Sequence, residues 1–178
     1  MEKLKESHQV EVVWRSFELR PVDAPPISAE YRAKIEANRP RLYSMAKEQY
    51  DLEMNPGPFG INTRPALVGA KFAEAQGLGD AYSTAIFEAY WLRASNIEEP
   101  AVLGEIAAAI GLDQADFLAA LADEGYQTQM MGDVQQAQQY GLGGVPALVF
   151  DNKYLVSGAQ PYPVLAEVVE KIEAGEAG

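Results

Sequence analysis

The sequence predicts an α/β fold in which a small sheet carries a long helical insertion. Strand-like sequence appears at residues 9–19, where Val, Trp and Phe are frequent, and returns only at 147–156. Between these stretches, about five segments carry apolar residues at helical spacing. The order strand, helical block, β-hairpin and helix therefore assigns residues 28–141 to a helical insertion. Residues 9–27 and 142–174 form the part that holds the sheet.

The first strand is expected at Gln9–Leu19, and Pro21 ends it. The proline-rich residues 21–27 prevent regular structure until Ser28, whose hydroxyl can cap a helix. That helix is long and polar. We expect it to break near Pro40, because a proline inside a helix removes one backbone donor.

The rest of the insertion is predicted to be helical, because start signals, apolar faces and terminal glycines follow one another along it. Asn62 or Thr63 caps the next helix, and Asp113 caps a later one. In order, the predicted helices cover about residues 64–76, 80–93, 100–110, 114–121 and 125–140.

The pattern changes near the C-terminus. Ala147–Phe150 (ALVF) is a short apolar strand, residues 151–153 (DNK) form a tight turn, and Tyr154–Val156 is the returning strand. Pro161 opens a last helix, whose apolar residues recur at helical spacing. This part of the chain is therefore predicted to be a β-hairpin followed by a helix.

The charge of the chain excludes two classes of partner. The formal net charge is −12 at pH 7, whereas nucleic acids and anionic membrane surfaces attract basic faces. No apolar run approaches the roughly 20 residues that span a bilayer. The first eight residues, MEKLKESH, are polar and lack the apolar core of a signal peptide. We therefore expect a cytoplasmic protein that binds neither nucleic acid nor membrane.

The chemistry available to the chain is limited because it has no cysteine and one histidine, His8. Disulfides, thiolate nucleophiles and multi-histidine metal sites are excluded. His8 is interpreted as a solvated residue ahead of the first strand. No catalytic residue, metal site or cofactor is predicted.

The most specific stretch is 143–160, GGVPALVFDNKYLVSGAQ. It resembles the FrnE-like branch of the DsbA family, within the thioredoxin superfamily. The resemblance implies a cis peptide bond between Val145 and Pro146, and a substrate-binding groove formed by Gly144, Val145 and Pro146. It also implies that the backbone of Val145 can pair with an extended peptide by β-addition.

The resemblance covers about residues 9–172, and it implies a thioredoxin-like (DsbA-type) sheet with a helical insertion. The SGAQ sequence at 157–160 favours the FrnE-like branch over the related glutathione transferase kappa and 2-hydroxychromene-2-carboxylate isomerase enzymes.

The sequence departs from this family at its start. The family begins with a strand and a C-x-x-C motif at a helix N-terminus, but only eight residues precede Gln9 here. That first strand would lie between the strand at 9–19 and the strand at 147–150. We expect a truncated chain that lacks the first strand and the C-x-x-C segment. The alternatives are direct closure of the sheet, or a second chain that fills the gap in a homodimer.

Three functions remain open. The first is a thiol–disulfide oxidoreductase of the FrnE type that is truncated or degenerate and redox-inactive, because no thiol exists to form a mixed disulfide. The second is a non-catalytic module that binds an extended peptide or small molecule in the cis-proline groove. The third is a kappa-like glutathione-dependent isomerase or transferase.

Overall fold

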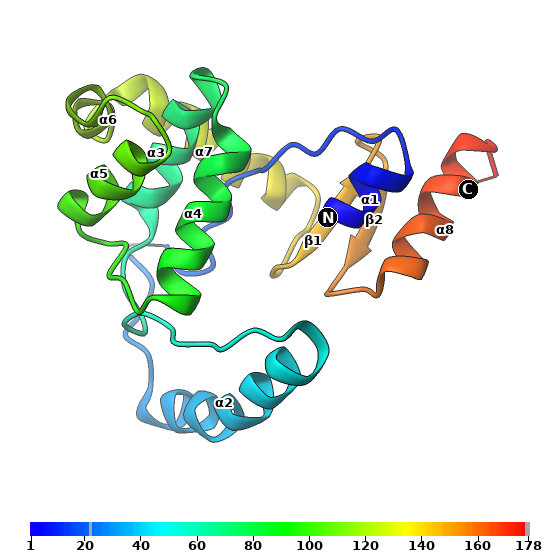
Figure 1. The fold of residues 1–178 in the computed structure, drawn as a ribbon, viewed down its shortest axis with the longest axis horizontal. Helices are drawn as coiled ribbons and strands as arrows, with labels where there is room; N and C mark the ends of the chain where they lie inside the picture. The colour runs from blue at the N-terminus through cyan, green and yellow to red at the C-terminus, as the bar shows by residue number, and fades with distance from the viewer. Residues whose placement is uncertain (22, 177–178) are drawn as a thin grey trace. The chain divides into compact units, whose positions relative to one another are not determined.

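A computed structural model of the protein describes residues 1–21 and 23–176. The chain forms two compact units. The sheet unit comprises Met1–Leu19 and Asp133–Gly178, and the helical unit comprises Arg20–Gly132 (Figure 1). The predicted domain division assigns residues 9–27 and 142–174 to the sheet-bearing part and residues 28–141 to the helical insertion. It stays a prediction.

The sheet unit is built on one antiparallel hairpin. Its strands are β1 (Ala147–Phe150) and β2 (Tyr154–Ser157), and the register pairs Ala147 with Ser157 and Phe150 with Tyr154. Asp151 and Asn152 adopt positive φ values of 51° and 53° in the turn, a conformation that Asp and Asn tolerate better than most residues. The predicted hairpin is confirmed.

The predicted strand at Gln9–Leu19 is wrong, because this segment has no regular secondary structure. A strand exists only through pairing with a neighbour. Within the described residues, β1 and β2 pair with each other and with no third strand. The composition of 9–19 is that of a strand, but within the described residues this segment takes part in no strand pair.

Two helices complete the core of the sheet unit. These are α1 (Glu2–Ser7) and α8 (Tyr162–Glu173) (Figure 1). Leu4 of α1 is 1% exposed and packs with Leu165, Ala166 and Val169 of α8. A six-residue helix is not stable alone in water, so α1 depends on the burial of Leu4. Partly buried side chains from the hairpin and its surroundings pack against this cluster: Val10, Leu148, Phe150, Val156 and Tyr162.

The helical unit confirms the predicted helices of the insertion. Its helices are α2 (Ala29–Tyr50), α3 (Arg64–Ala75), α4 (Gly79–Leu92), α5 (Pro100–Ala109) and α6 (Gln114–Ala120), and α7 (Glu124–Gln139) begins within it. As predicted, Ser28 caps α2 and Asp113 caps α6, because their side chains accept hydrogen bonds from the Tyr31 and Asp116 amides. None of the described helices is both long and apolar enough to cross a bilayer.

The predicted break at Pro40 is wrong, because α2 is an unbroken helix of 22 residues that contains Pro40. Proline removes the hydrogen bond to the carbonyl four positions earlier, here that of Glu36. Both Glu36 and Pro40 are exposed. Water can therefore donate to the released carbonyl, and the helix continues.

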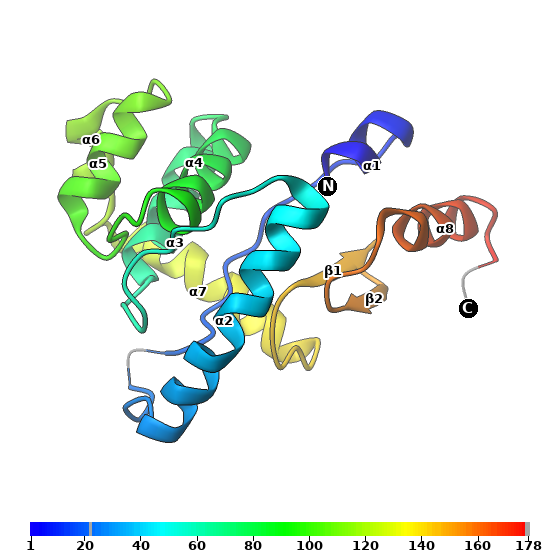
Figure 2. The same ribbon diagram turned by 60° about the horizontal axis from the view of Figure 1, so that its bottom comes forward.

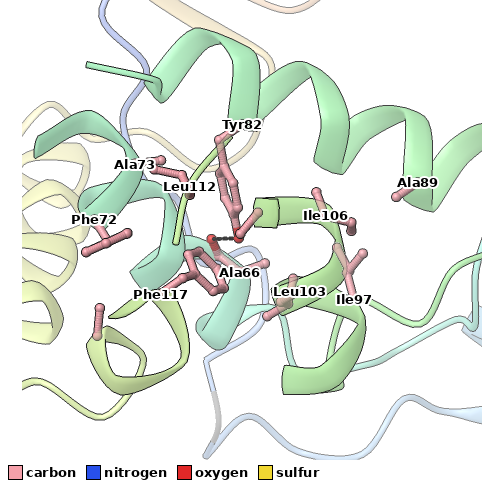
Figure 3. Close-up of a cluster of buried hydrophobic side chains, with 12 residues drawn as sticks. Ala66, Phe72, Ala73, Tyr82, Ala89, Ile97, Leu103, Ile106, Leu112 and Phe117 are labelled. Carbon is pink, nitrogen blue, oxygen red and sulfur yellow. Dashed lines mark hydrogen bonds between the residues drawn. The ribbon is translucent and has the colours of Figure 1, made fainter. Parts of the chain in front are cut away.

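The core of the helical unit is centred on aromatic side chains from three helices (Figure 3). Phe117 is fully buried and lies 5.9 Å from Phe72 and 5.6 Å from Tyr82 between ring centroids. A Cβ atom at Gly69 would lie 2.5 Å from the Tyr82 hydroxyl and 2.6 Å from Phe117. Glycine at position 69 thus lets the rings pack against α3. The Tyr82 hydroxyl donates to the carbonyl of Ala66 at 3.3 Å.

Leu4→Ala should lower the opening free energy of α8 amides by about 2–5 kcal/mol, because it removes a fully buried side chain from the sheet unit. Native-state hydrogen exchange measures this quantity. Val164→Ala, on α8 and 40% exposed, is the matched control and should change it little. Equal losses in the two variants would show that Leu4 does not hold the unit together.

Tyr82 should make the protein less stable at high pH. Burial raises the pKa of its hydroxyl above the ordinary value of 10.0. Above about pH 10 the unfolded phenol loses its proton while the folded one keeps it, so stability falls as the pH rises. Tyr82→Phe should reduce this alkaline loss and cost about 1 kcal/mol at neutral pH through the lost hydrogen bond. Urea denaturation at several pH values tests both effects, with exposed Tyr31→Phe as control.

Candidate functional site

The predicted site residues form an exposed loop directly before β1. Gly144, Val145 and Pro146 precede Ala147, and the peptide bond between Val145 and Pro146 is cis. The Val145 side chain is 56% exposed. A Cβ atom placed on Gly143 or Gly144 would meet no other atom within 4 Å. The backbone of this loop is therefore open to a partner.

The hydrogen bonds of the hairpin determine which backbone groups of β1 point away from β2. The Gly158 amide donates to the Pro146 carbonyl at 2.8 Å. In an antiparallel pair, bonded and non-bonded residues alternate. Given the register, Leu148 and Phe150 bond to β2, whereas the amides and carbonyls of Ala147 and Val149 point outward.

We call this row of outward groups the outer edge of β1. Within the part of the chain that the structure describes, no strand pairs with it. A row of unpaired donors and acceptors on an edge strand is a template for another extended chain. The outer edge begins where the open loop at 143–146 ends, so the loop and the edge form one continuous backbone surface.

A buried carboxylate fixes the segment that the sequence predicted as a strand. The Asp133 side chain is 6% exposed, and one of its oxygens accepts a hydrogen bond from the Ser16 amide at 2.9 Å. The other oxygen lies 3.2 Å from a guanidinium nitrogen of Arg15, whose side chain is 58% exposed. A bond from α7 to the backbone thus replaces strand pairing at Ser16.

Sequence reasoning missed Asp133 and Ser16. One signal was available: Met130, Val134 and Ala137 are buried along one face of α7, and position 133 falls on the same face. An acidic residue inside an apolar helical stripe requires a buried partner. The identity of that partner could not be predicted, because a backbone amide has no sequence signature.

His8 is not the solvated residue that the sequence suggested. Its side chain is 12% exposed and lies with Ser7 and Tyr162, with its Nε2 atom 3.8 Å from a carboxylate oxygen of Glu170. The docking of α1 on α8 through Leu4 brings these side chains together.

The Ser7 hydroxyl has further hydrogen-bond partners besides His8. The Ser7 hydroxyl lies 2.7 Å from the Lys3 carbonyl and accepts from the Tyr162 hydroxyl at 2.9 Å. Its single proton is used in the bond to Lys3. His8 Nδ1 lies 2.8 Å from the same oxygen and can donate to it in the tautomer that carries its proton on Nδ1. These contacts join α1 to α8.

The helical unit contains a buried cation, Lys71, which is 3% exposed. Its ammonium lies 3.0 Å and 2.8 Å from the two carboxylate oxygens of Glu74, one turn along α3. A buried charge is tolerated when it is paired in this way. In the described ranges, no group of three or more His, Cys, Asp or Glu residues could hold a metal ion.

The chain is similar to several known proteins. Residues 1–170 match the family model described as a DSBA-like thioredoxin domain. The uncharacterized protein YwbO of Bacillus subtilis is 27% identical over 157 residues, which cover 84% of this chain and 76% of YwbO.

Two solved structures extend the comparison. A probable DsbA oxidoreductase from Streptomyces coelicolor superposes with a TM-score of 0.81 at 28% identity, covering 99% of this chain and 82% of that one. A 2-hydroxychromene-2-carboxylate isomerase gives a TM-score of 0.79 at 17% identity, covering 99% and 90%. The second likeness shows the fold alone.

Asp133→Ala should release the segment around Ser16. The change removes both acceptors of a buried carboxylate, so we expect a stability loss of about 1–3 kcal/mol and faster hydrogen exchange at the Ser16 amide. Arg15→Ala should cost less, because the guanidinium is mostly exposed. Thermal unfolding and exchange NMR measure both quantities. A larger effect at Arg15 would show that the ion pair, not the backbone bond, holds the segment.

Proposed function

The chain belongs to the DSBA-like thioredoxin domain family, and from that premise we propose that it binds an extended polypeptide segment along the loop at 143–146 and the outer edge of β1. In this proposal the bound segment adds a strand to the sheet. Backbone hydrogen bonds would supply the affinity, and exposed side chains such as Val145 would contribute selectivity.

The observation that carries the proposal is the outer edge itself. Ala147 and Val149 direct amides and carbonyls away from β2, and an isolated two-stranded sheet is marginally stable in water. A third strand would satisfy these groups and extend the sheet. The proposal is also supported by the resemblance to the FrnE-like branch, because by that resemblance a further strand of the sheet is expected at this edge.

The loop supports the same conclusion. Gly143 and Gly144 carry no side chain that would block an approaching backbone, and space around them is open. Val145 is exposed although it is a large apolar residue. A bound chain would remove its side chain from water, which favours association by about 1–2 kcal/mol.

Binding a substrate and exchanging its disulfide require different chemical groups. Thiol–disulfide exchange requires a thiolate that attacks a disulfide sulfur, and these 178 residues contain no cysteine. In this proposal, the chain therefore binds the substrate, and its own side chains take no part in thiol exchange. Within the family, the SGAQ sequence at 157–160 supports the FrnE-like branch, and the proposed setting is the cytoplasm.

A pair of proline variants tests the proposal. Val149 and Leu155 lie opposite each other in the register, and both amides point away from the other strand of the hairpin. Val149→Pro removes a donor from the outer edge of β1, and Leu155→Pro removes the matching donor from β2. Neither change removes a hydrogen bond between β1 and β2, and edge positions of this kind tolerate proline.

The probe is a fluorescein-labelled, cysteine-free octapeptide rich in Val, Thr and Tyr. Fluorescence anisotropy should show binding that Val149→Pro weakens by about tenfold and Leu155→Pro changes little. Circular dichroism checks that both variants fold. Equal weakening by the two variants, or no binding to the unmodified chain, would overturn the proposal.

A further inference from the structure

Helix α2 is poorly covered for its length. Of its 22 residues, Ala46 alone is buried within the described chain. Helices in proteins are stabilised mainly by packing of an apolar face, so a helix of this length needs a broader contact. The contact present is narrow: the guanidinium groups of Arg32 and Arg39 lie 5.3 Å and 5.8 Å from the ring centroid of Phe59.

A different face of α2 carries exposed apolar side chains and two cations. Tyr31, Leu42 and Met45 are 50%, 39% and 44% exposed, and Lys34 and Arg41 are also exposed. These positions share one face because they recur at spacings of three, four and seven residues. We call them together the outer face of α2; the course of the helix itself is seen in Figure 2.

The cations of this face are available for a partner. Lys47 is paired with Asp51 and Glu53 at 2.7 Å and 3.2 Å. Among the described residues, no ion pair involves Lys34 or Arg41. Helix α2 carries five Lys or Arg and three Glu, which gives it a net charge of +2. Because the whole chain has a net charge of −12, the residues outside α2 have a net charge of −14.

The same unit carries a surface of the opposite charge. Residues 98–124 contain seven Asp or Glu, all exposed, and no Lys, Arg or His. They lie on α5, α6 and the adjoining segments, and we call them the acidic surface. None of these carboxylates forms an ion pair with a described residue. Leu118 of α6 is 37% exposed among them, so this surface also offers an apolar contact.

We propose that the outer face of α2 docks on the acidic surface of a second copy of this chain. Each copy carries both surfaces, so a two-fold axis makes the contact twice, as closed homodimers require. Burial of Tyr31, Leu42 and Met45 would contribute apolar contact. Lys34 and Arg41 would face carboxylates and fix the orientation.

Ionic strength is the first test of this dimer. Sedimentation velocity of the full chain should show a dimer at 20 mM salt and a shift toward monomer at 500 mM salt, because the charged rim is screened there. A monomer at every salt concentration and at protein concentrations up to the millimolar range would overturn the proposal.

Charge reversal identifies the two surfaces. Lys34→Glu with Arg41→Glu should weaken the dimer at least about tenfold, and so should Glu105→Lys with Asp116→Lys. Neither pair includes a buried or capping side chain. Lys153→Glu with Lys171→Glu makes the same change in net charge as the α2 pair, but outside both surfaces, and should leave the dimer intact.

Mixing the two reversed variants gives the decisive result. In the mixed pair, the reversed α2 meets the reversed acidic surface, and the two unreversed surfaces meet each other. A 1:1 heterodimer should therefore return, although each variant alone is a monomer. Failure of this rescue, or a dimer that neither reversal weakens, would overturn the assignment of the surfaces.

Discussion

A sheet of two strands does not support itself, and the sheet unit is organised around this constraint. Within the described residues, half of the hairpin's backbone groups have no strand partner. The unit is held instead by two side-chain contacts: Leu4 of α1 is buried against α8, and Asp133 of α7 is bonded to the amide of Ser16. These two contacts position the hairpin and leave the outer edge of β1 open beside its exposed loop.

The helices could be predicted from the sequence because their signals are local. Caps such as Asp113, apolar spacing within ten to twenty residues and terminal glycines all act inside one segment. The hairpin was equally predictable, because its turn residues and both strands lie within eleven positions. The prediction at 9–19 failed because a strand needs a distant partner, which composition does not reveal. The prediction at Pro40 failed because both Glu36 and Pro40 are exposed, so water can bond to the carbonyl that the proline releases.

The candidate site was predictable in part. The stretch at 143–160 indicated the loop before β1, because a specific series of residues extends through both strands and the turn. The bond between Asp133 and the Ser16 amide was not predictable, since it joins a side chain to a backbone group 117 positions away. The outward direction of Ala147 and Val149 also required the register of the hairpin. The proposed peptide binding thus depends on backbone geometry more than on any reactive side chain.

The central claim is that the outer edge of β1 accepts an extended chain, and amide hydrogen exchange tests it directly. The account predicts an alternating pattern in the free protein: Leu148 exchanges slowly because it bonds to β2, whereas Ala147 and Val149 exchange fast. Addition of the octapeptide should slow exchange at Ala147 and Val149 and leave Leu155 unchanged. Unchanged exchange at Ala147 and Val149, or protection at Leu155 instead, would contradict the account.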